Sequence, residues 1–173
     1  EQLTLMAFVA AASETLRIIS SVMIVPHRNP ILCAKSIATS DVLSEGRMTI
    51  GVGVGWMEEE FEALDATDFK KRGAVTDEYI RIWKKLWTGE AVSHQSEVYS
   101  FEELYCQPAP LQDPHPPIWI GGHSNPALRR VARLGDGWHP VGATAASPLP
   151  PAEMIERLAF LRELTEAEGR DFD

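Results

Sequence analysis

Short apolar runs alternate with longer stretches of helical character along this sequence. The short runs cover residues 17–25, 47–53, 117–122 and 136–141, and turn residues flank them. Runs of this kind are typical of strands buried in a parallel sheet. The longer stretches predict helices over residues 3–14, 30–43, 57–64, 76–88, 127–134 and 151–168.

Capping signals mark where several of these helices begin. Asn29 is a favoured N-cap residue and Pro30 suits the first helical position, and Asn125 with Pro126 repeats this pair. Thr76 precedes two acidic residues, which are favourable in a first helical turn. We therefore expect helices to begin at these three points.

Side-chain spacing predicts which helix faces are buried. The helix expected from Thr76 has a buried stripe made of Ile80, Trp83, Leu86 and Trp87. The next helix is expected to carry its three arginines on the outer face, namely Arg129, Arg130 and Arg133. A short hairpin is expected around residues 96–104.

The alternation of helices and strands predicts an α/β fold with a parallel sheet covered by helices. Two architectures fit this order, a doubly wound sheet and a (β/α)8 barrel of the TIM type. The 173 residues, of which 45% are hydrophobic, suit one globular domain over 1–173. Four strands are expected, with helices on their flanks.

The composition disfavours some classes of binding partner. The net charge of −9 disfavours binding to nucleic acid and to anionic membranes, although a local pocket for one phosphate stays open. Cys33 and Cys106 have no metal or redox spacing, and the five histidines form no metal motif, so no metal site is expected. No apolar stretch reaches the ~20 residues that span a bilayer, and a reduced, cytoplasmic setting is expected.

The glycine-rich segment GVGVGW, residues 51–56, could be a dinucleotide-binding motif. Its glycines do not fit the G-x-G-x-x-G spacing in either register. Gly53 and Gly55 are instead expected to let a flat ring or another backbone approach the end of the strand. Trp56 is then a candidate wall for that ring. The alternative is a tightly packed strand end with a core tryptophan.

The segment GGHSNP, residues 121–126, lies between a strand and a helix. Gly121 and Gly122 offer amides at a helix N-terminus, which suits a phosphate, although an ordinary turn is the alternative. The same segment departs by one residue from the nucleophile elbow G-x-S-x-G, so a serine hydrolase with Ser124 as nucleophile is a second hypothesis.

Two histidines follow predicted strands, where α/β enzymes hold their active sites. His27 comes just after the first strand and His139 lies on the fourth. Either can serve as a general acid or base near neutral pH, while a structural role is the commoner use of a lone histidine.

Taken together, four segments resemble the luciferase-like monooxygenase superfamily, in particular its coenzyme F420-dependent branch. They are SSVMIVPHRNP, AKSIATSDVLSEGRMTIGVGVGW, EEEFEALD and PPIWIGGHSNPALRRVARLGDGWHP, and the run from Arg72 to Thr88 lies between them. The resemblance implies a (β/α)8 barrel and hydride transfer between F420 and a small organic substrate. An FMN-dependent monooxygenase that uses O2 is the nearest alternative, and a homodimer is the assembly expected of the family.

The resemblance also implies roles for individual residues. Ser21 and Val22 match a strand bulge, often with a cis peptide, that presses on the cofactor ring from behind. The ring-side strand end corresponds to Gly53, Gly55 and Trp56, and the phosphate loop corresponds to Gly121, Gly122 and Ser124.

The chain departs from the family pattern in two respects. Trp56 stands where sugar-phosphate dehydrogenases of this branch have a glutamate, and no lysine follows the fourth strand, so a sugar-phosphate substrate is not expected. A complete barrel takes ~250 residues, so the chain is expected to cover about the middle half of one. Two strands are expected to be missing on each side, and open sheet edges favour association.

Overall fold

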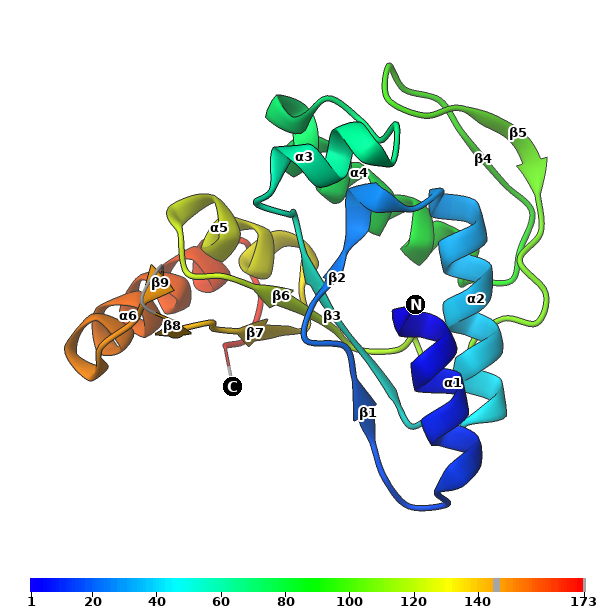
Figure 1. The fold of residues 1–173 in the computed structure, drawn as a ribbon, viewed down its shortest axis with the longest axis horizontal. Coiled ribbons are helices and arrows are strands. Elements are labelled where there is room, and N and C mark those ends of the chain that lie inside the picture. Colours follow the sequence, from blue (N-terminus) through cyan, green and yellow to red (C-terminus); the bar gives the residue numbers. More distant parts are fainter. Residues whose placement is uncertain (145–146, 173) are drawn as a thin grey trace.

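The computed structural model describes residues 1–144 and 147–172. Helices and parallel strands alternate along the chain (Figure 1). The elements are α1 (Gln2–Ala12), β1 (Ile18–Ile19), β2 (Met23–Ile24), the 3-10 turn η1 (Val25–His27), α2 (Pro30–Leu43), β3 (Met48–Gly53), α3 (Glu58–Ala63), the 3-10 turn η2 (Phe69–Lys71), α4 (Arg72–Leu86), β4 (Val92–His94), β5 (Phe101–Leu104), β6 (Ile118–Gly121), α5 (Asn125–Leu134), β7 (Gly137–His139), β8 (Ala143–Thr144), β9 (Ser147–Pro148) and α6 (Pro151–Ala167).

The main sheet is parallel, and its strand order follows the chain: β1, β3, β6 and β7, with β2 also paired to β3. A doubly wound sheet reverses its strand order at a switch point, and this sheet does not. Successive helices also pack on one another in chain order, α1 on α2, α2 on α4, α4 on α5 and α5 on α6 (Figure 1). The described residues therefore form a singly wound segment of a TIM-type barrel, as the family resemblance implies.

The first predicted strand is interrupted in the structure. Ile18 lies opposite Met48 and Met23 lies opposite Val52, so this strand advances five residues while β3 advances four. One extra residue between β1 and β2 is the signature of a β-bulge. The bulge occupies residues 20–22. The single strand predicted over 17–25 is thus two short strands, β1 and β2, separated by this bulge.

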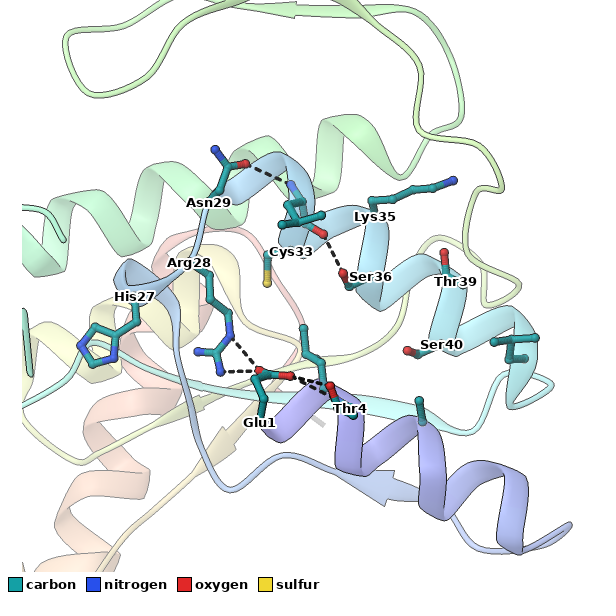
Figure 2. A pocket seen from close by; sticks show the side chains of 14 residues that line it. Glu1, Thr4, His27, Arg28, Asn29, Cys33, Lys35, Ser36, Thr39 and Ser40 are labelled. Carbon is teal, nitrogen blue, oxygen red and sulfur yellow. Dashed lines mark hydrogen bonds and ion pairs between the residues drawn. The ribbon is translucent and has the colours of Figure 1, made fainter. Parts of the chain in front are cut away.

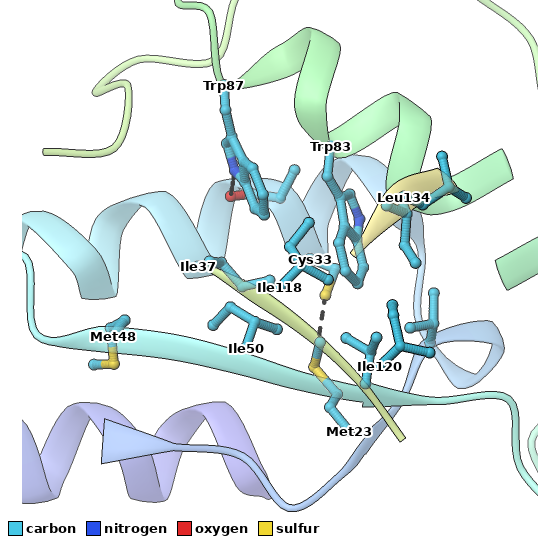
Figure 3. Packing of buried hydrophobic residues seen from close by; sticks show 14 of the residues in the cluster. Met23, Cys33, Ile37, Met48, Ile50, Trp83, Trp87, Ile118, Ile120 and Leu134 are labelled. Atoms are coloured by element: carbon cyan, nitrogen blue, oxygen red, sulfur yellow. Dashed lines mark hydrogen bonds between the residues drawn. The ribbon is translucent and has the colours of Figure 1, made fainter. Parts of the chain in front are cut away.

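The core lies between the sheet and helices α2 and α4 (Figure 3). The predicted stripe on α4 is confirmed, because all four of its members are at most 2% exposed. Two of them also anchor α2, since the indole Nε1 of Trp83 donates to the Pro30 carbonyl at 3.1 Å and that of Trp87 to the Ala34 carbonyl at 3.0 Å. These bonds satisfy the buried indole N–H groups while the rings fill the interior.

Some helix boundaries differ from those expected. Helix α4 begins at Arg72, four residues before Thr76, and Thr76 is buried with its hydroxyl donating to the Arg72 carbonyl. Helix α2 is capped by Asn29 as predicted. At α5 the cap is Ser124, one residue earlier than Asn125, and its hydroxyl oxygen accepts from the Ala127 amide.

One of the three arginines expected on an outer face is buried. Arg130 is 7% exposed, and its guanidinium contacts the Asp77 carboxylate and donates to the Gly73 carbonyl at 3.1 Å. It lies where α5 packs against α4, which the sequence of α5 alone does not reveal. Arg129 and Arg133 are exposed, as expected.

The predicted hairpin is present, with its strands displaced. Strand β4 pairs antiparallel with β5, so residues 95–100 connect the two strands and the first strand precedes the expected segment. Nε2 of His94 in β4 lies 2.5 Å from Oε1 of Glu78 in α4, and this contact connects the hairpin to the helix. Burial favours a higher pKa for Glu78, but hydrogen bonds from Ser96 and His94 outweigh it and lower that pKa. A second small hairpin, β8 with β9, was not expected from the sequence.

A buried carboxylate fixes the segment that leads into β6. Asp41 is fully buried, and its Oδ2 accepts from the amides of Leu111 and Gln112 at 2.9 and 3.0 Å. The Gln112 side-chain amide donates to Asp41 Oδ1 and to the Met48 carbonyl at 2.6 and 2.7 Å. The Asp41 carboxylate and the Gln112 side chain therefore connect helix α2, strand β3 and the segment before β6.

We expect Asp41→Ala to lower the free energy of unfolding by roughly 3 kcal/mol, because it leaves buried amide donors without an acceptor. Asp41→Asn is expected to be similarly damaging, since it replaces one of the two acceptor oxygens with an amide group. Urea denaturation measures both, with the exposed Glu59→Ala on α3 as the control. A loss no larger than that of the control would show that this clamp contributes nothing.

Candidate active site at the carboxyl edge of the sheet

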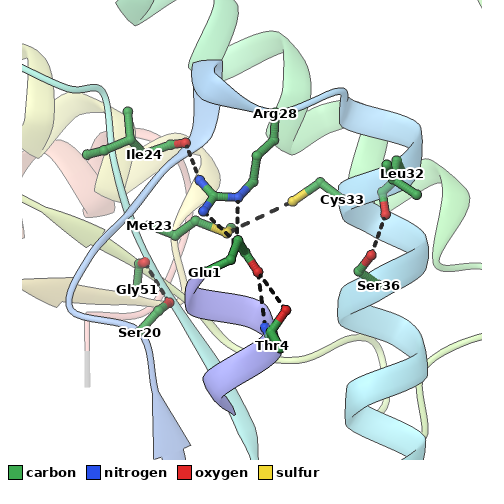
Figure 4. A network of polar contacts seen from close by, with 10 residues as sticks. All are labelled: Glu1, Thr4, Ser20, Met23, Ile24, Arg28, Leu32, Cys33, Ser36 and Gly51. Carbon is green, nitrogen blue, oxygen red and sulfur yellow. Dashed lines mark hydrogen bonds and ion pairs between the residues drawn. The ribbon is translucent and has the colours of Figure 1, made fainter. Parts of the chain in front are cut away.

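The bulge between β1 and β2 contacts the other strands of the sheet. Ser20 is buried, and its hydroxyl donates to the Gly51 carbonyl of β3 at 2.8 Å (Figure 4). Ser21 Oγ lies 2.9 Å from Nε2 of His139 at the end of β7. The Ser21–Val22 peptide is cis, as the family resemblance implies. The bulge thus joins the first and last strands of the main sheet at its carboxyl edge.

Glycines on the neighbouring strands make room for the bulge. A Cβ added to Gly51 would lie 1.9 Å from the Ser20 carbonyl oxygen, and one at Gly53 would lie 2.8 Å from Val22 Cγ2. At Gly121 of β6 it would lie 3.1 Å from Val22 Cγ1. The sequence analysis expected either a flat ring or another backbone to approach the strand end. These contacts show the close approach of another part of the chain, the bulge.

Arg72, the first residue of α4, contacts the segment that follows β3. Gly55 has φ +83°, and a Cβ there would lie 2.7 Å from the Phe61 ring. Its carbonyl accepts from Arg72 Nε at 3.2 Å. Trp56, the next residue, is 78% exposed, so the alternative of a core tryptophan is wrong. Its role as a wall for a ring stays a prediction.

The loop after β6 is tied to β7. Gly122 has φ +91°, which favours glycine, and its carbonyl accepts from the Trp138 indole at 2.6 Å. The Ser124 hydroxyl caps α5, and within the described part of the chain no histidine hydrogen-bonds to it. The pairing of base and nucleophile that a hydrolase needs is therefore not formed at Ser124.

Two buried polar atoms beside the start of α5 lack partners. Nδ1 of His123 and Nε of Arg157 are buried and make no hydrogen bond within the residues that the structure describes. Arg157, from α6, also donates to the Asn125 side chain at 2.8 Å, which places its guanidinium beside the first turn of α5. Arg157 also pairs with the Glu153 carboxylate at 3.5 Å, so its Nε is the unpartnered donor of that guanidinium, while Nδ1 of His123 donates in only one tautomer. An unpartnered N–H beside a helix N-terminus suits an anion. No pattern in the sequence pointed to Arg157.

The two histidines predicted as acid–base residues lie in different surroundings. His139 lies at the carboxyl edge, bonded to Ser21. His27 lies in η1 and packs edge-on against Phe61, with ring centroids 4.5 Å apart. Burial lowers the pKa of His27, Glu60 opposes this shift, and Arg28 adds to it. Burial thus favours the neutral form of His27, and within the described residues the bulge has a hydrogen bond with His139 and none with His27.

His27 instead borders a cavity of about 720 Å³ between α1 and α2 (Figure 2). Arg28 lines this cavity and pairs with Glu1 at 2.7 Å (Figure 4). The cavity includes none of the predicted site residues except His27. Because ligands of parallel α/β folds bind at the carboxyl ends of the strands, we assign the candidate site to the edge around the bulge.

The fit between Val22 and Gly53 can be measured with a double-mutant cycle. Gly53→Ala is expected to lower the free energy of unfolding by about 1–3 kcal/mol, because the new methyl group collides with Val22. In the Val22→Ala background the collision is relieved, so the same change is expected to cost at least about 1 kcal/mol less. Additive effects would contradict the contact.

The lowered pKa of His27 predicts a pH dependence of stability. Below the ordinary value of 6.5 the unfolded chain binds a proton that the folded chain refuses, so stability is lost as the pH falls through that value. We expect His27→Gln to lose less stability than the wild type between about pH 7.5 and about pH 5.5. Equal losses in urea titrations at the two pH values would refute this.

The sequence of this chain is similar to those of known proteins. A family model described as luciferase-like monooxygenase matches residues 1–173. The FMNH(2)-dependent dimethylsulfone monooxygenase of Pseudomonas putida is 34% identical over 141 residues, which are 80% of this chain and 38% of that protein. The chain spans 55% to 56% of the length of uncharacterized relatives from Mycobacterium tuberculosis.

Solved structures share the fold. Monooxygenase RslO1 from Streptomyces bottropensis has a TM-score of 0.85 at 23% identity, and the F420-dependent tetrahydromethanopterin reductase from Methanopyrus kandleri has 0.84 at 16%. Each match covers 99% of this chain and 51% of the other. Because the family model matches from Glu1 to Asp173, this chain belongs to the luciferase-like monooxygenase family.

Proposed function

We propose that the chain supplies the cofactor-binding edge of an oxidoreductase that transfers a hydride between coenzyme F420 and a small organic substrate. One observation carries the proposal: the bulge, the glycine-lined strand ends and an unpartnered set of donors lie along the same carboxyl edge. A tricyclic ring needs a flat apolar support, and its phosphate tail needs an anion site. The bulge would supply the support, and the start of α5 would supply the anion site.

The residues present fit such a cofactor. The methyl groups of Val22 would support the ring, because Gly53 and Gly121 carry no side chain that stands above them. The phosphate would lie at the first turn of α5, where Arg157 and His123 have unpartnered buried nitrogens. The exposed Trp56 would cover the ring from the rim.

When bound, F420 supplies a two-electron hydride donor or acceptor. The chain's own residues orient the ring through Val22, neutralise the phosphate through Arg157 and hold a proton at His139. His27 stays a second candidate for this task; it packs on Phe61, and burial lowers its pKa. The organic substrate would enter from the side of Trp56. A homodimer is the assembly that we propose from the family resemblance.

A second candidate is an FMN-dependent monooxygenase that uses O2. The specific support for it is the 34% identity to an FMNH(2)-dependent enzyme over 80% of this chain. FMN and F420 present a tricyclic ring and a phosphate, so Val22 and Arg157 would serve either one. The hydrolase hypothesis has weaker support, because Ser124 caps α5 and His139 pairs with Ser21.

A fluorescence titration with F420 and FMN side by side tests the cofactor. We expect tight F420 binding and weaker FMN binding, while the reverse order would favour the monooxygenase. Arg157→Gln is expected to weaken binding of the preferred cofactor about tenfold, the effect of losing one charge-assisted hydrogen bond. Arg129→Gln, on the exposed face of α5, is the matched control.

Phosphate-free analogues sharpen this test. Riboflavin and the deazaflavin without its phosphate tail are expected to bind the wild type and Arg157→Gln equally, because neither reaches the anion site. If Arg157→Gln weakened the phosphate-free compounds to the same extent, the assignment of the phosphate to α5 would be wrong. If neither F420 nor FMN bound the chain, the proposed function would fail for this chain.

A further inference from the structure

The parallel sheet has two open edges. Its strand order begins with β1 and ends with β7, and within the described residues no strand pairs with the outer edge of either one. In a parallel pair, successive residues direct their backbone groups to opposite sides of the strand. Ile18 and Ser20 donate their amides toward β3, so the amide of Ile19 points to the open edge. An open edge of this kind is a site for pairing with a further strand.

The sheet is curved as part of a closed barrel would be. Ser21 Oγ and His139 Nε2 are 2.9 Å apart, although β3 and β6 lie between their strands. Neighbouring strands are ~4.8 Å apart, so a flat sheet would separate these strands by about 14 Å. The main sheet of the described residues has five strands, of which β1 and β2 are one strand interrupted by the bulge. A TIM-type barrel has eight strands, which is the number that two such sheets supply.

The inner face of the sheet leaves large apolar side chains uncovered. Ile118 and Ile120 are buried against the helices, so Trp119 between them points to the opposite, inner face, where it is 39% exposed. Ile19 is 38% exposed beside the buried Ile18. The interior of a TIM-type barrel is filled by layers of side chains. Both exposed side chains thus lie where a closed barrel would supply further side chains to cover them.

Helix α1 has an apolar side that faces away from α2. Residues 2–12 contain no charged side chain, and a helix that is apolar all round is normally buried. Leu3 and Ala7 line the cavity between α1 and α2. Leu5 is two positions from each of them, about 200° around the helix, and therefore points away from α2. It is 62% exposed, so this side of α1 is uncovered.

Helix α6 has an apolar side of the same kind. Arg157 contacts Asn125 at the start of α5, so Ile155, which lies about 200° from Arg157 around the helix, points away from α5. Ile155 is 68% exposed and Leu158 is 40% exposed. A cavity of about 240 Å³ lies beside this helix, lined in part by Leu158 and by Trp138 of β7. A further strand and helix would cover these side chains and fill the cavity.

We propose that two copies of this chain close one eight-stranded barrel. A two-fold rotation about the barrel axis places β1 of each copy beside β7 of the other, in parallel orientation, and places α1 beside α6. The helices then continue around the barrel in the order in which α1, α2, α4, α5 and α6 already pack. The inference goes beyond the proposed function, because the assembly needs no cofactor. Closure would also add the strand ends of the second copy to the rim of the candidate site.

Sedimentation equilibrium of the 173-residue chain over a range of concentrations tests the assembly. We expect the mass of two chains. Leu5→Lys and Ile155→Lys are each expected to weaken the dimer at least about tenfold, because each places a charge in an apolar contact. Both positions are exposed in the single chain, so each variant is expected to keep its fold, which circular dichroism checks.

Leu32→Lys is the matched control for these two variants. Leu32 is 67% exposed, but it belongs to α2, which already has α1 and α4 as neighbours. We expect this variant to dimerise as the wild type does. If Leu32→Lys separated the copies and Leu5→Lys did not, the copies would meet through the outer faces of their helices, and the closed barrel would be wrong. A mass of one chain at every concentration would also overturn the proposal.

Amide hydrogen exchange tests which surfaces meet. In the dimer the Ile19 amide donates to β7 of the other copy, so its exchange is expected to be at least about tenfold slower than in the Leu5→Lys monomer. The amide of Glu97, exposed between β4 and β5, is expected to exchange equally in both. A dimer in which the Ile19 amide exchanges as fast as in the monomer would refute the strand pairing. Neither measurement uses a cofactor, so its outcome is separate from that of the F420 and FMN titrations.

Discussion

The candidate site depends on one constraint, the fit of the bulge at residues 20–22 against its neighbouring strands. Ser20 bonds to β3, Val22 lies against glycines of β3 and β6, and Ser21 reaches β7. Each contact needs a short partner or a missing side chain at the facing position. Because a side chain at Gly51 would collide with the backbone of Ser20 itself, the bulge and the glycines have to occur together.

The helices outside the sheet fix the positions of the strands against which the bulge packs. Trp83 and Trp87 tie α4 to α2 through buried hydrogen bonds, and Arg72 ties the start of α4 to the end of β3. Asp41 ties α2 to the segment that leads into β6. The strand ends at the carboxyl edge are therefore fixed from outside the barrel segment, and the edge itself is left to the short side chains and glycines that a ligand can approach.

The electrostatics of the edge are local. The chain as a whole carries a charge of −9, yet the first turn of α5 combines Arg157, which is paired with Glu153, with the partial positive charge of a helix N-terminus. An acidic chain can bind a phosphate in this way because nearby donors act over short distances, while distant surface carboxylates are screened by salt. Net charge thus speaks against large anionic partners and leaves a single phosphate open.

The sequence alone determined the order of elements, the parallel sheet, the buried stripe of α4 and the family, because each follows from local periodicity, capping chemistry or a motif. The glycine-rich strand ends and the residues of the bulge could also be named in advance. Only the tertiary structure decided that Val22 fills the space above Gly53 and Gly121, that Arg130 is buried and that Arg157 reaches α5. It also decided that His139 pairs with Ser21 and that His27 packs on Phe61. The reason is physical: these contacts join residues far apart in the chain, and the curvature of the packed sheet sets their distances.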